Sequence, residues 1–241
     1  MTTLAAEKFT TRHARHLTQI ILTLALCLVL QFRAFSQTPP ADLTQRIDHA
    51  EVARETDLPG YTVTERYSIF RNGSNQPAAT AVVNTVYRRG QGKTYTVVSR
   101  TGSSFLQKYL IDRIIAEQTG LSKGDERRNA LITSANYTMQ FEHEESFAGR
   151  DCLVLKLIPR KKSPYLMDGE IWVDAHNYHL VQVKGSPSAA PSIWVGTPEI
   201  QRNYQELDGF ALAKTSRSES KRPVIGTTVI EIDYDDYRIQ Q

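Results

Sequence analysis

Residues 150–184 contain the most regular pattern in the chain and constrain its fold more than any other segment. Three apolar or β-branched runs, 152–158, 170–174 and 178–184, follow one another with only turn-forming residues between them. Runs of this kind, bounded by Pro, Gly, Asn and Asp, predict strands. Connections this short join antiparallel neighbours. The sequence therefore predicts that these strands form the middle of one large meander.

The segments on either side show the same period of two. We expect further strands at 61–70, 80–89, 93–100, 137–144, 192–195, 200–206, 210–218 and 227–237, which gives about ten strands in all. In one of them Tyr137, Met139 and Phe141 alternate with polar residues, which is typical of a strand with one dry and one solvated face. Leu207-Asp208-Gly209 predicts a tight hairpin turn.

Two segments have a helical period instead. Residues 41–56 predict an N-terminal helix with Asp42 in position to cap it. Ser103 and Ser104 can each cap a second helix, and Gln107, three residues after Ser104, fits a capping box. A shorter helix over 125–134 follows it. We therefore expect a helical hairpin to interrupt an otherwise continuous series of strands.

The N-terminal 36 residues predict a secretory signal peptide. Basic residues precede an apolar run at 20–30, and Ala34-Phe35-Ser36 fits a cleavage site. The alternative is a retained membrane anchor, for which the run is shorter than the roughly 20 residues that span a bilayer. We assign 1–36 to the signal peptide and 37–241 to a single domain.

Removal of that segment changes what charge and cysteine content imply. The full chain has 29 Lys and Arg and 26 Asp and Glu, of which four and one lie in 1–36, so the mature chain has 25 of each. A neutral chain lacks the electrostatic basis for a nucleic-acid partner. Cys152 is then the single cysteine, and we expect a buried apolar residue rather than a reactive thiol.

The order of elements resembles the periplasmic lipoprotein-carrier superfamily, which includes the outer-membrane lipoprotein-sorting proteins and a domain of a related envelope-stress regulator. The shared features are a signal peptide, a leading helix, three strands, an inserted helical pair and a long meander. The phrases at 169–174, 180–183 and 204–209 are similar to that superfamily's strand-turn-strand ending. The resemblance covers nearly all of residues 41–238.

The resemblance implies a mainly β (α+β) fold. Its curved antiparallel sheet of about ten strands would form an incomplete barrel, with the N-terminal helix and the helical hairpin as lid and an apolar concave face that receives acyl chains. Independently of the resemblance, a strongly twisted sheet of about ten strands tends to curl. Its apolar inner face then needs either side chains or a ligand to fill it.

The candidate ligand-binding residues are aromatic and aliphatic side chains on the dry strand faces. Tyrosine suits a place where a lipid chain meets its head group, because it joins an apolar ring to a polar tip. The alternative for each residue is ordinary core packing. The candidates are Tyr67, Ile69, Val83, Tyr87, Tyr95, Val97, Tyr137, Met139, Phe141, Ile230 and Ile232.

A basic turn at Arg160, Lys161 and Lys162 is the candidate partner-binding site. It is either a solvated hairpin tip or a contact for an acidic partner or for anionic head groups at a membrane surface. His176 and His179 lie in a turn without further ligands nearby in sequence, so we expect neither a metal nor a cofactor.

The sequence therefore predicts a monomeric, non-enzymatic periplasmic protein that binds a lipid or a lipoprotein acyl chain. One alternative is an envelope-stress or protein-interaction module that binds an envelope protein and transfers no lipid. Another is a hydrolase acting on envelope lipid or polysaccharide, which would need His143, His176 and an acidic residue to meet at one pocket.

Overall fold

A single antiparallel sheet organises the chain. The computed structural model describes residues 40–190, 197–222 and 226–240. The strands are, in chain order, Gly60–Arg71 (β1), Ala79–Arg88 (β2), Gly92–Gly102 (β3), Tyr137–Phe147 (β4), Arg150–Pro159 (β5), Met167–Asp174 (β6), Leu180–Pro187 (β7), Glu199–Leu207 (β8), Phe210–Arg222 (β9) and Gly226–Ile239 (β10). Their order across the sheet is β3-β2-β1-β10-β9-β8-β7-β6-β5-β4.

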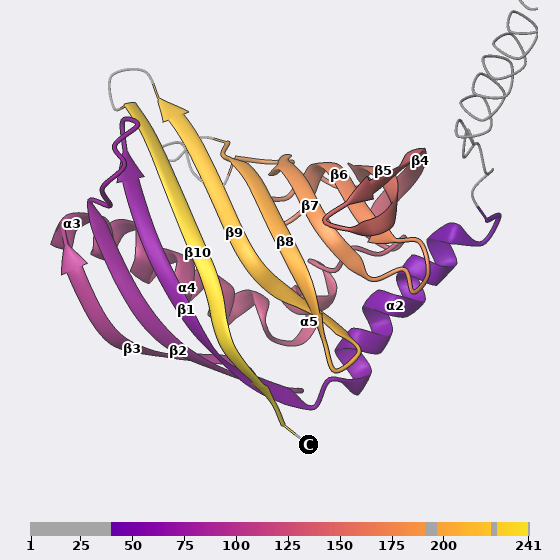
Figure 1. The fold of residues 1–241 in the computed structure, drawn as a ribbon, viewed down its shortest axis with the longest axis horizontal. Helices are drawn as coiled ribbons and strands as arrows, with labels where there is room; N and C mark the ends of the chain where they lie inside the picture. The colour runs from indigo at the N-terminus through magenta and orange to yellow at the C-terminus, as the bar shows by residue number, and fades with distance from the viewer. Residues whose placement is uncertain (1–39, 191–196, 223–225, 241) are drawn as a thin grey trace, which may run out of the picture. The chain divides into compact units, whose positions relative to one another are not determined.

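The sheet is open, because β3 and β4 form its two edges and do not pair with each other. The first strand pairs with the last inside the sheet, from Tyr61 opposite Ile239 to Arg71 opposite Thr228. The segment between β3 and β4 carries the helical insertion, which lies on one face of the sheet behind β1, β10 and β9 (Figure 1). The mainly β fold with an incomplete barrel is thereby confirmed.

The strands form where the sequence alternates. In β1, Val63, Glu65, Tyr67 and Ile69 are buried, and most of the residues between them are partly exposed. The turn at Leu207-Asp208-Gly209 also forms as expected, since both central residues have positive φ, 49° and 80°, as a two-residue hairpin turn of the primed type requires. The predicted strand at 192–195 and the signal peptide at 1–36 lie outside the described residues.

The N-terminal helix forms over Leu43–Asp57 (α2), but Asp42 does not cap it through its side chain. The Asp42 carboxylate instead accepts a hydrogen bond from Arg46 Nε at 2.9 Å. Because the two residues are one helical turn apart, the guanidinium competes for the carboxylate that would otherwise bind the first backbone N–H groups. The predicted cap is therefore wrong, although the helix is confirmed.

The helical insertion consists of Ser104–Leu106 (α3), the π-helical Gln107–Ile111 (η1), Asp112–Leu121 (α4) and Gly124–Arg128 (α5). Of the two predicted caps, Ser103 is the one that caps the first turn. Gln107 differs from the expectation, because its Nε2 donates to the Thr101 carbonyl at 2.6 Å instead of completing a capping box.

The last helix of the insertion is also shorter than predicted. It ends at Arg128 and not near residue 134, because Asn136 Nδ2 donates to the carbonyls of Arg128 and Leu131, both at 2.9 Å, and holds that segment as turns. Among the residues described, no helix is long and apolar enough to cross a membrane.

Two hydrophobic cores lie on the inner face of the sheet. The aliphatic core joins α2 to β4–β7 and consists of Leu43, Ile47, Tyr137, Leu153, Leu155, Leu157, Leu166, Ile171, Val173, Leu180 and Val183. The tyrosine core joins β1, β2, β9, β10 and the helical insertion, and consists of Leu58, Tyr61, Val63, Tyr67, Ile69, Ala79, Ala81, Val83, Tyr87, Ile111, Leu212, Ile232 and Tyr234.

Cys152 belongs to a third, smaller cluster with Val154, Trp172 and Val181. Its side chain is buried, and burial raises the pKa of the thiol to about 11. A thiol that stays protonated at neutral pH is a poor nucleophile. The prediction of a buried apolar residue is confirmed.

Candidate functional site

A cavity of about 460 Å³ lies between the two cores, under the helical insertion. Its wall is formed from both sides, with Tyr61 and Tyr234 from the tyrosine core and Tyr137 and Leu180 from the aliphatic core. The helix α4 and the segment before it close it with residues such as Leu110 and Ile114. Small-molecule sites in proteins commonly have volumes of about 300–1,000 Å³, so the space suits a ligand.

The cavity exists because the inner face of β9 carries small side chains. Ala213, Ser216 and Ser218 line the space where larger residues would fill it. On neighbouring β10 and β8, Ile230 and Ile200 pair with Ser218 and provide the apolar wall beside it. The chain therefore has room for an apolar ligand at the centre of the sheet.

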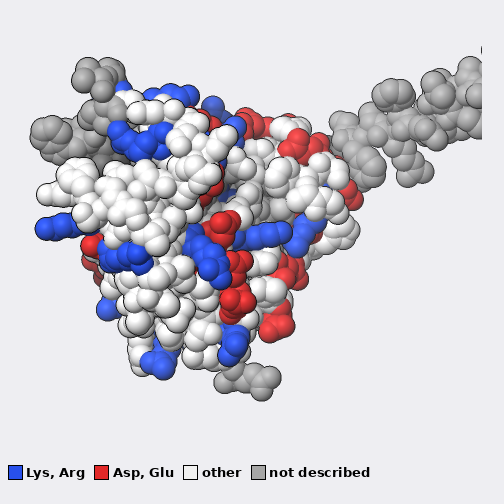
Figure 2. Space-filling view, turned by 60° about the vertical axis from the view of Figure 1, so that its left-hand side comes forward, with Lys and Arg blue, Asp and Glu red and all other residues white. Residues whose placement is uncertain are grey.

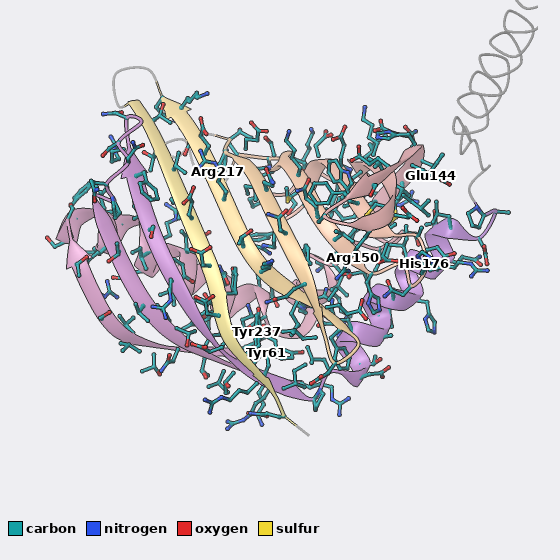
Figure 3. All side chains as sticks on the ribbon, in the orientation of Figure 1. Tyr61, Glu144, Arg150, His176, Arg217 and Tyr237 are labelled. Carbon is teal, nitrogen blue, oxygen red and sulfur yellow. The ribbon has the colours of Figure 1, made fainter. Side chains whose placement is uncertain are left out.

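Tyrosines form much of the remaining wall. Tyr61 packs against Tyr87 and Tyr237, with ring centroids 5.2 Å and 5.3 Å apart, and Figure 3 shows Tyr61 and Tyr237 side by side near the C-terminus. The Tyr237 hydroxyl donates to the Ala213 carbonyl at 2.9 Å. Burial raises the pKa of Tyr237 and of Tyr234, so their hydroxyls stay neutral at physiological pH.

Most of the charged side chains around the cavity are paired. Arg54 binds Glu51 at 2.8 Å within α2. Arg127 of α5 binds Glu55 of α2 through two hydrogen bonds of 2.5 Å and 2.9 Å. The bidentate pair between Arg127 and Glu55 links the helical insertion to the N-terminal helix.

Lys93 and Arg202 also line the cavity, and neither forms an ion pair with any carboxylate that the structure describes. The Nε atom of Arg202 is buried and has no hydrogen-bond partner there. Burial acts to lower the pKa of Lys93, but electrostatic interactions with Tyr61 and Glu65 outweigh it and the pKa is raised. Both side chains therefore carry a positive charge into a largely apolar space.

Glu65 is the nearby buried carboxylate. It is fully buried in β1, and its Oε2 accepts a hydrogen bond of 2.5 Å from the Tyr67 hydroxyl. Its other oxygen, Oε1, is buried without a partner among the described residues. Burial is the largest cause of the raised pKa of Tyr67, followed by the charge of Glu65.

Exposed aromatic side chains lie in the helical insertion and in the loop between β5 and β6. Tyr109 and Tyr165 line the cavity and are 56% and 48% exposed, and Phe105 stacks on Tyr109 with a centroid distance of 4.4 Å. Figure 2 brings the β3 and α3 side forward and shows broad uncharged surface there, interrupted by basic and acidic groups.

The predicted ligand-binding residues fall into three groups. Tyr87, Tyr137, Ile230 and Ile232 line the cavity. Tyr67, Ile69 and Val83 lie behind it in the tyrosine core, against which Tyr95 also packs, while Met139 and Phe141 pack against the aliphatic core. Val97 is 37% exposed on the edge strand.

The other predicted residues lie away from the cavity. Arg160, Lys161 and Lys162 are exposed at the turn after β5, where Arg160 donates to the Ser134 carbonyl at 2.7 Å. His143 and His176 do not line the cavity; each lies near an acidic residue of its own, Glu145 and Asp174 respectively. In the part of the chain that the structure describes, no three His, Cys, Asp or Glu residues converge as metal ligands would.

Sequence reasoning missed the charged residues of the cavity, although a signal for them was present. Arg202 is two residues from Ile200 and from Tyr204, and all three line the cavity. Side chains two residues apart on a strand point to the same face of the sheet. A charged residue with apolar residues at i−2 and i+2 is therefore expected on the inner face.

No protein-family model and no curated protein matches the chain. Solved structures do. The chain aligns with an outer-membrane lipoprotein-sorting protein domain from Vibrio parahaemolyticus at a TM-score of 0.50 and 16% identity, over 83% of this chain and 94% of that one. A LolA superfamily protein from Nitrosomonas europaea aligns at a TM-score of 0.49 and 12% identity, over 82% and 94%.

The complex of MucA and MucB from Pseudomonas aeruginosa aligns at a TM-score of 0.28 and 12% identity, over 83% of this chain and 100% of that one. At their scores this alignment and the Nitrosomonas one add nothing to the fold assignment. The likeness to the Vibrio domain shows that the chain has the fold of the lipoprotein-sorting proteins, as the sequence predicted.

Proposed function

We propose that this is a non-enzymatic periplasmic protein that accommodates a lipid or lipoprotein acyl chain in the cavity under the helical insertion. The observation that carries the proposal is the cavity itself, an apolar space of about 460 Å³ left open by Ala213, Ser216 and Ser218. A void of this size between two packed cores is unusual unless something occupies it. The lipoprotein-sorting fold is consistent with an acyl chain as the occupant.

The exposed Tyr109 and Tyr165 support entry of a chain at this side, because they line the cavity and also reach solvent. Aromatic side chains with a polar tip suit the boundary between an apolar ligand and water. We assign the basic turn at Arg160, Lys161 and Lys162 to contact with an acidic envelope protein or with anionic head groups, and we expect the protein to act as a monomer.

The test is mass spectrometry of organic extracts from the purified protein, compared with the variant Ser218→Trp. A tryptophan at this position would occupy the cavity, so the variant should lose the co-purified lipid. Lys214→Trp is the matched control, because Lys214 is exposed on the same strand. Empty wild-type protein that also binds no added fatty acyl probe would overturn the proposal.

A protein-interaction module is the second candidate, and the edge strand β3 favours it. Val97 and Val98 on this strand are 37% and 57% exposed, and one side of its backbone has no neighbour within the described sheet. An exposed edge of this kind can accept a strand from a partner. Recovery of one stoichiometric envelope protein without lipid, lost in a Val98→Lys variant, would favour this candidate over the carrier.

A further inference from the structure

Two positively charged side chains in the cavity, Lys93 and Arg202, limit the kind of head group that a bound lipid can have. Five basic side chains, Arg54, Lys93, Arg113, Arg127 and Arg202, line the cavity, against the three carboxylates Glu51, Glu55 and Glu117. Each of the three carboxylates pairs with one of the arginines. Lys93 and Arg202 are left without an ion pair among the residues described.

Glu65 can balance one of these two charges and no more. It contributes electrostatically to the raised pKa of both Lys93 and Arg202 from its buried place in β1. The tyrosines around it stay neutral, since burial raises the pKa of Tyr67 and of Tyr234. The internal segments 191–196 and 223–225 contain no Asp or Glu, so they supply no further carboxylate. One positive charge in the cavity therefore has no counter-charge among the residues that the structure describes.

An uncompensated cation in an apolar space is costly unless an anion meets it. Arg202 is suited to that role, because a guanidinium binds a carboxylate with two parallel hydrogen bonds and its buried Nε–H has no hydrogen-bond partner among the described residues. In the sheet register Arg202 lies opposite Ser216, whose side chain lines the same cavity and offers a neutral donor.

We propose that the cavity selects a single-chain amphiphile with a monoanionic carboxylate head, a long-chain fatty acid, whose carboxylate binds Arg202 and Lys93. The inference rests on the proposed function and adds the ligand class to it. The hydrocarbon chain lies along the wall formed by Ile200, Ile230 and Ile232. One net positive charge matches a carboxylate, whereas a phosphate dianion would leave a buried negative charge unpaired.

The experiment compares two probes on the purified, delipidated protein, cis-parinaric acid and its methyl ester, which differ in the charge of the head group. The wild type should bind the acid about tenfold more tightly than the ester, as a charge-assisted hydrogen bond implies. In Arg202→Gln the affinity for the acid should fall by about tenfold and that for the ester by much less.

Arg217→Gln is the matched control, because Arg217 is next to Ser216 on β9 but is exposed and pairs with Glu219 and Glu231. It should bind both probes as the wild type does. If Arg202→Gln does not fold, Lys93→Gln takes its place. The wild type should then bind the acid more tightly than the ester, and Lys93→Gln should lose that preference.

Equal binding of acid and ester by the wild type, with no effect of Arg202→Gln, would overturn the inference and leave acyl-chain binding intact. Binding of neither probe would overturn both. Equal loss in Arg202→Gln and Arg217→Gln would mean that overall charge, and not the cavity, sets the affinity, which also overturns the inference.

Discussion

The two cores of this protein differ in what fills them. The aliphatic core contains one tyrosine, Tyr137, and the side chains of Leu43 and Ile47 from α2 pack into it. The tyrosine core contains four buried tyrosines, includes Ala79 and Ala81, and adjoins the cavity. One half of the sheet is thus filled by aliphatic side chains and its own helix, while the other half contains tyrosine hydroxyls and a buried carboxylate, and the cavity lies between the two.

This difference indicates that the aliphatic core mainly stabilises the fold, whereas the tyrosine core is suited to ligand binding. Close packing of leucine and isoleucine stabilises without specifying a ligand. Tyrosine hydroxyls and charged groups are costly to bury unless a partner satisfies them. Their location beside a cavity therefore suggests that they bind something there. The two halves should therefore respond differently to pH and to mutation.

The largest expected effect is alkaline unfolding that starts from the tyrosine core. Burial raises the pKa of Tyr67, Tyr95, Tyr234 and Tyr237 above the value near 10 of an unfolded chain. Above about pH 10 the unfolded state therefore releases protons that the native state keeps, and stability falls as pH rises. In the aliphatic core Tyr137 has a pKa of about 12, also because of burial.

The measurement is tyrosinate absorbance followed together with circular dichroism as pH rises. Part of the tyrosine absorbance should appear only when the dichroism signal is lost, and both should change cooperatively between about pH 10 and 12. Titration of all tyrosines near pH 10 with an unchanged dichroism spectrum would show that the tyrosine core is open to water.

The second effect is the cost of making a hole in the filled half. Leu157 is fully buried in the aliphatic core, so Leu157→Ala should reduce the free energy of unfolding by about 2–5 kcal/mol in denaturant titration. Ser218→Leu places a larger side chain in the cavity between the two cores and should change stability by less than about 1 kcal/mol. Similar losses in the two variants would mean that the cavity is in fact packed.

The third effect isolates the hydrogen bond between Tyr67 and Glu65. Tyr67→Phe leaves Glu65 Oε2 buried without its donor, and we expect a loss of about 1–3 kcal/mol in the free energy of unfolding. The double variant Tyr67→Phe, Glu65→Leu should recover part of that loss, because both polar partners are then gone. Additive losses in the double-mutant cycle would argue against coupling of these two side chains.

Most of the sheet could be predicted from the sequence because its strands alternate and its turns carry Gly, Asp and Asn. The fold class, the N-terminal helix and the insertion between the third and fourth strands follow from that pattern. The residues that cap the helices were harder to predict. Ser103 and Ser104 both fit the sequence pattern of an N-cap. In the structure Gly102 has a positive φ of 78° and the next residue, Ser103, is the cap.

The cavity was harder to predict, since a dry strand face has the same pattern whether the core behind it is full or empty. Four of the eleven candidate side chains line the cavity, and the others pack behind it or lie exposed. What the pattern did contain is a charged residue between apolar ones, as Lys93 precedes Tyr95 by two residues and Glu65 stands between Val63 and Tyr67. A charged residue between apolar residues on a strand is thus as good an indicator of a cavity as an aromatic one.

The smallest effect concerns how the helical insertion is attached to the tyrosine core. The Ser103 hydroxyl accepts a hydrogen bond from the Leu106 N–H, so Ser103→Ala should destabilise the first turn by about 1 kcal/mol. Ser104→Ala is the matched control and should have little effect, because Ser104 is inside the turn. Hydrogen exchange should report faster opening of 104–121 in the first variant alone, with the strands of the aliphatic core unchanged. Equal exchange in both variants would mean that packing of Ile111, and not the cap, holds the insertion in place.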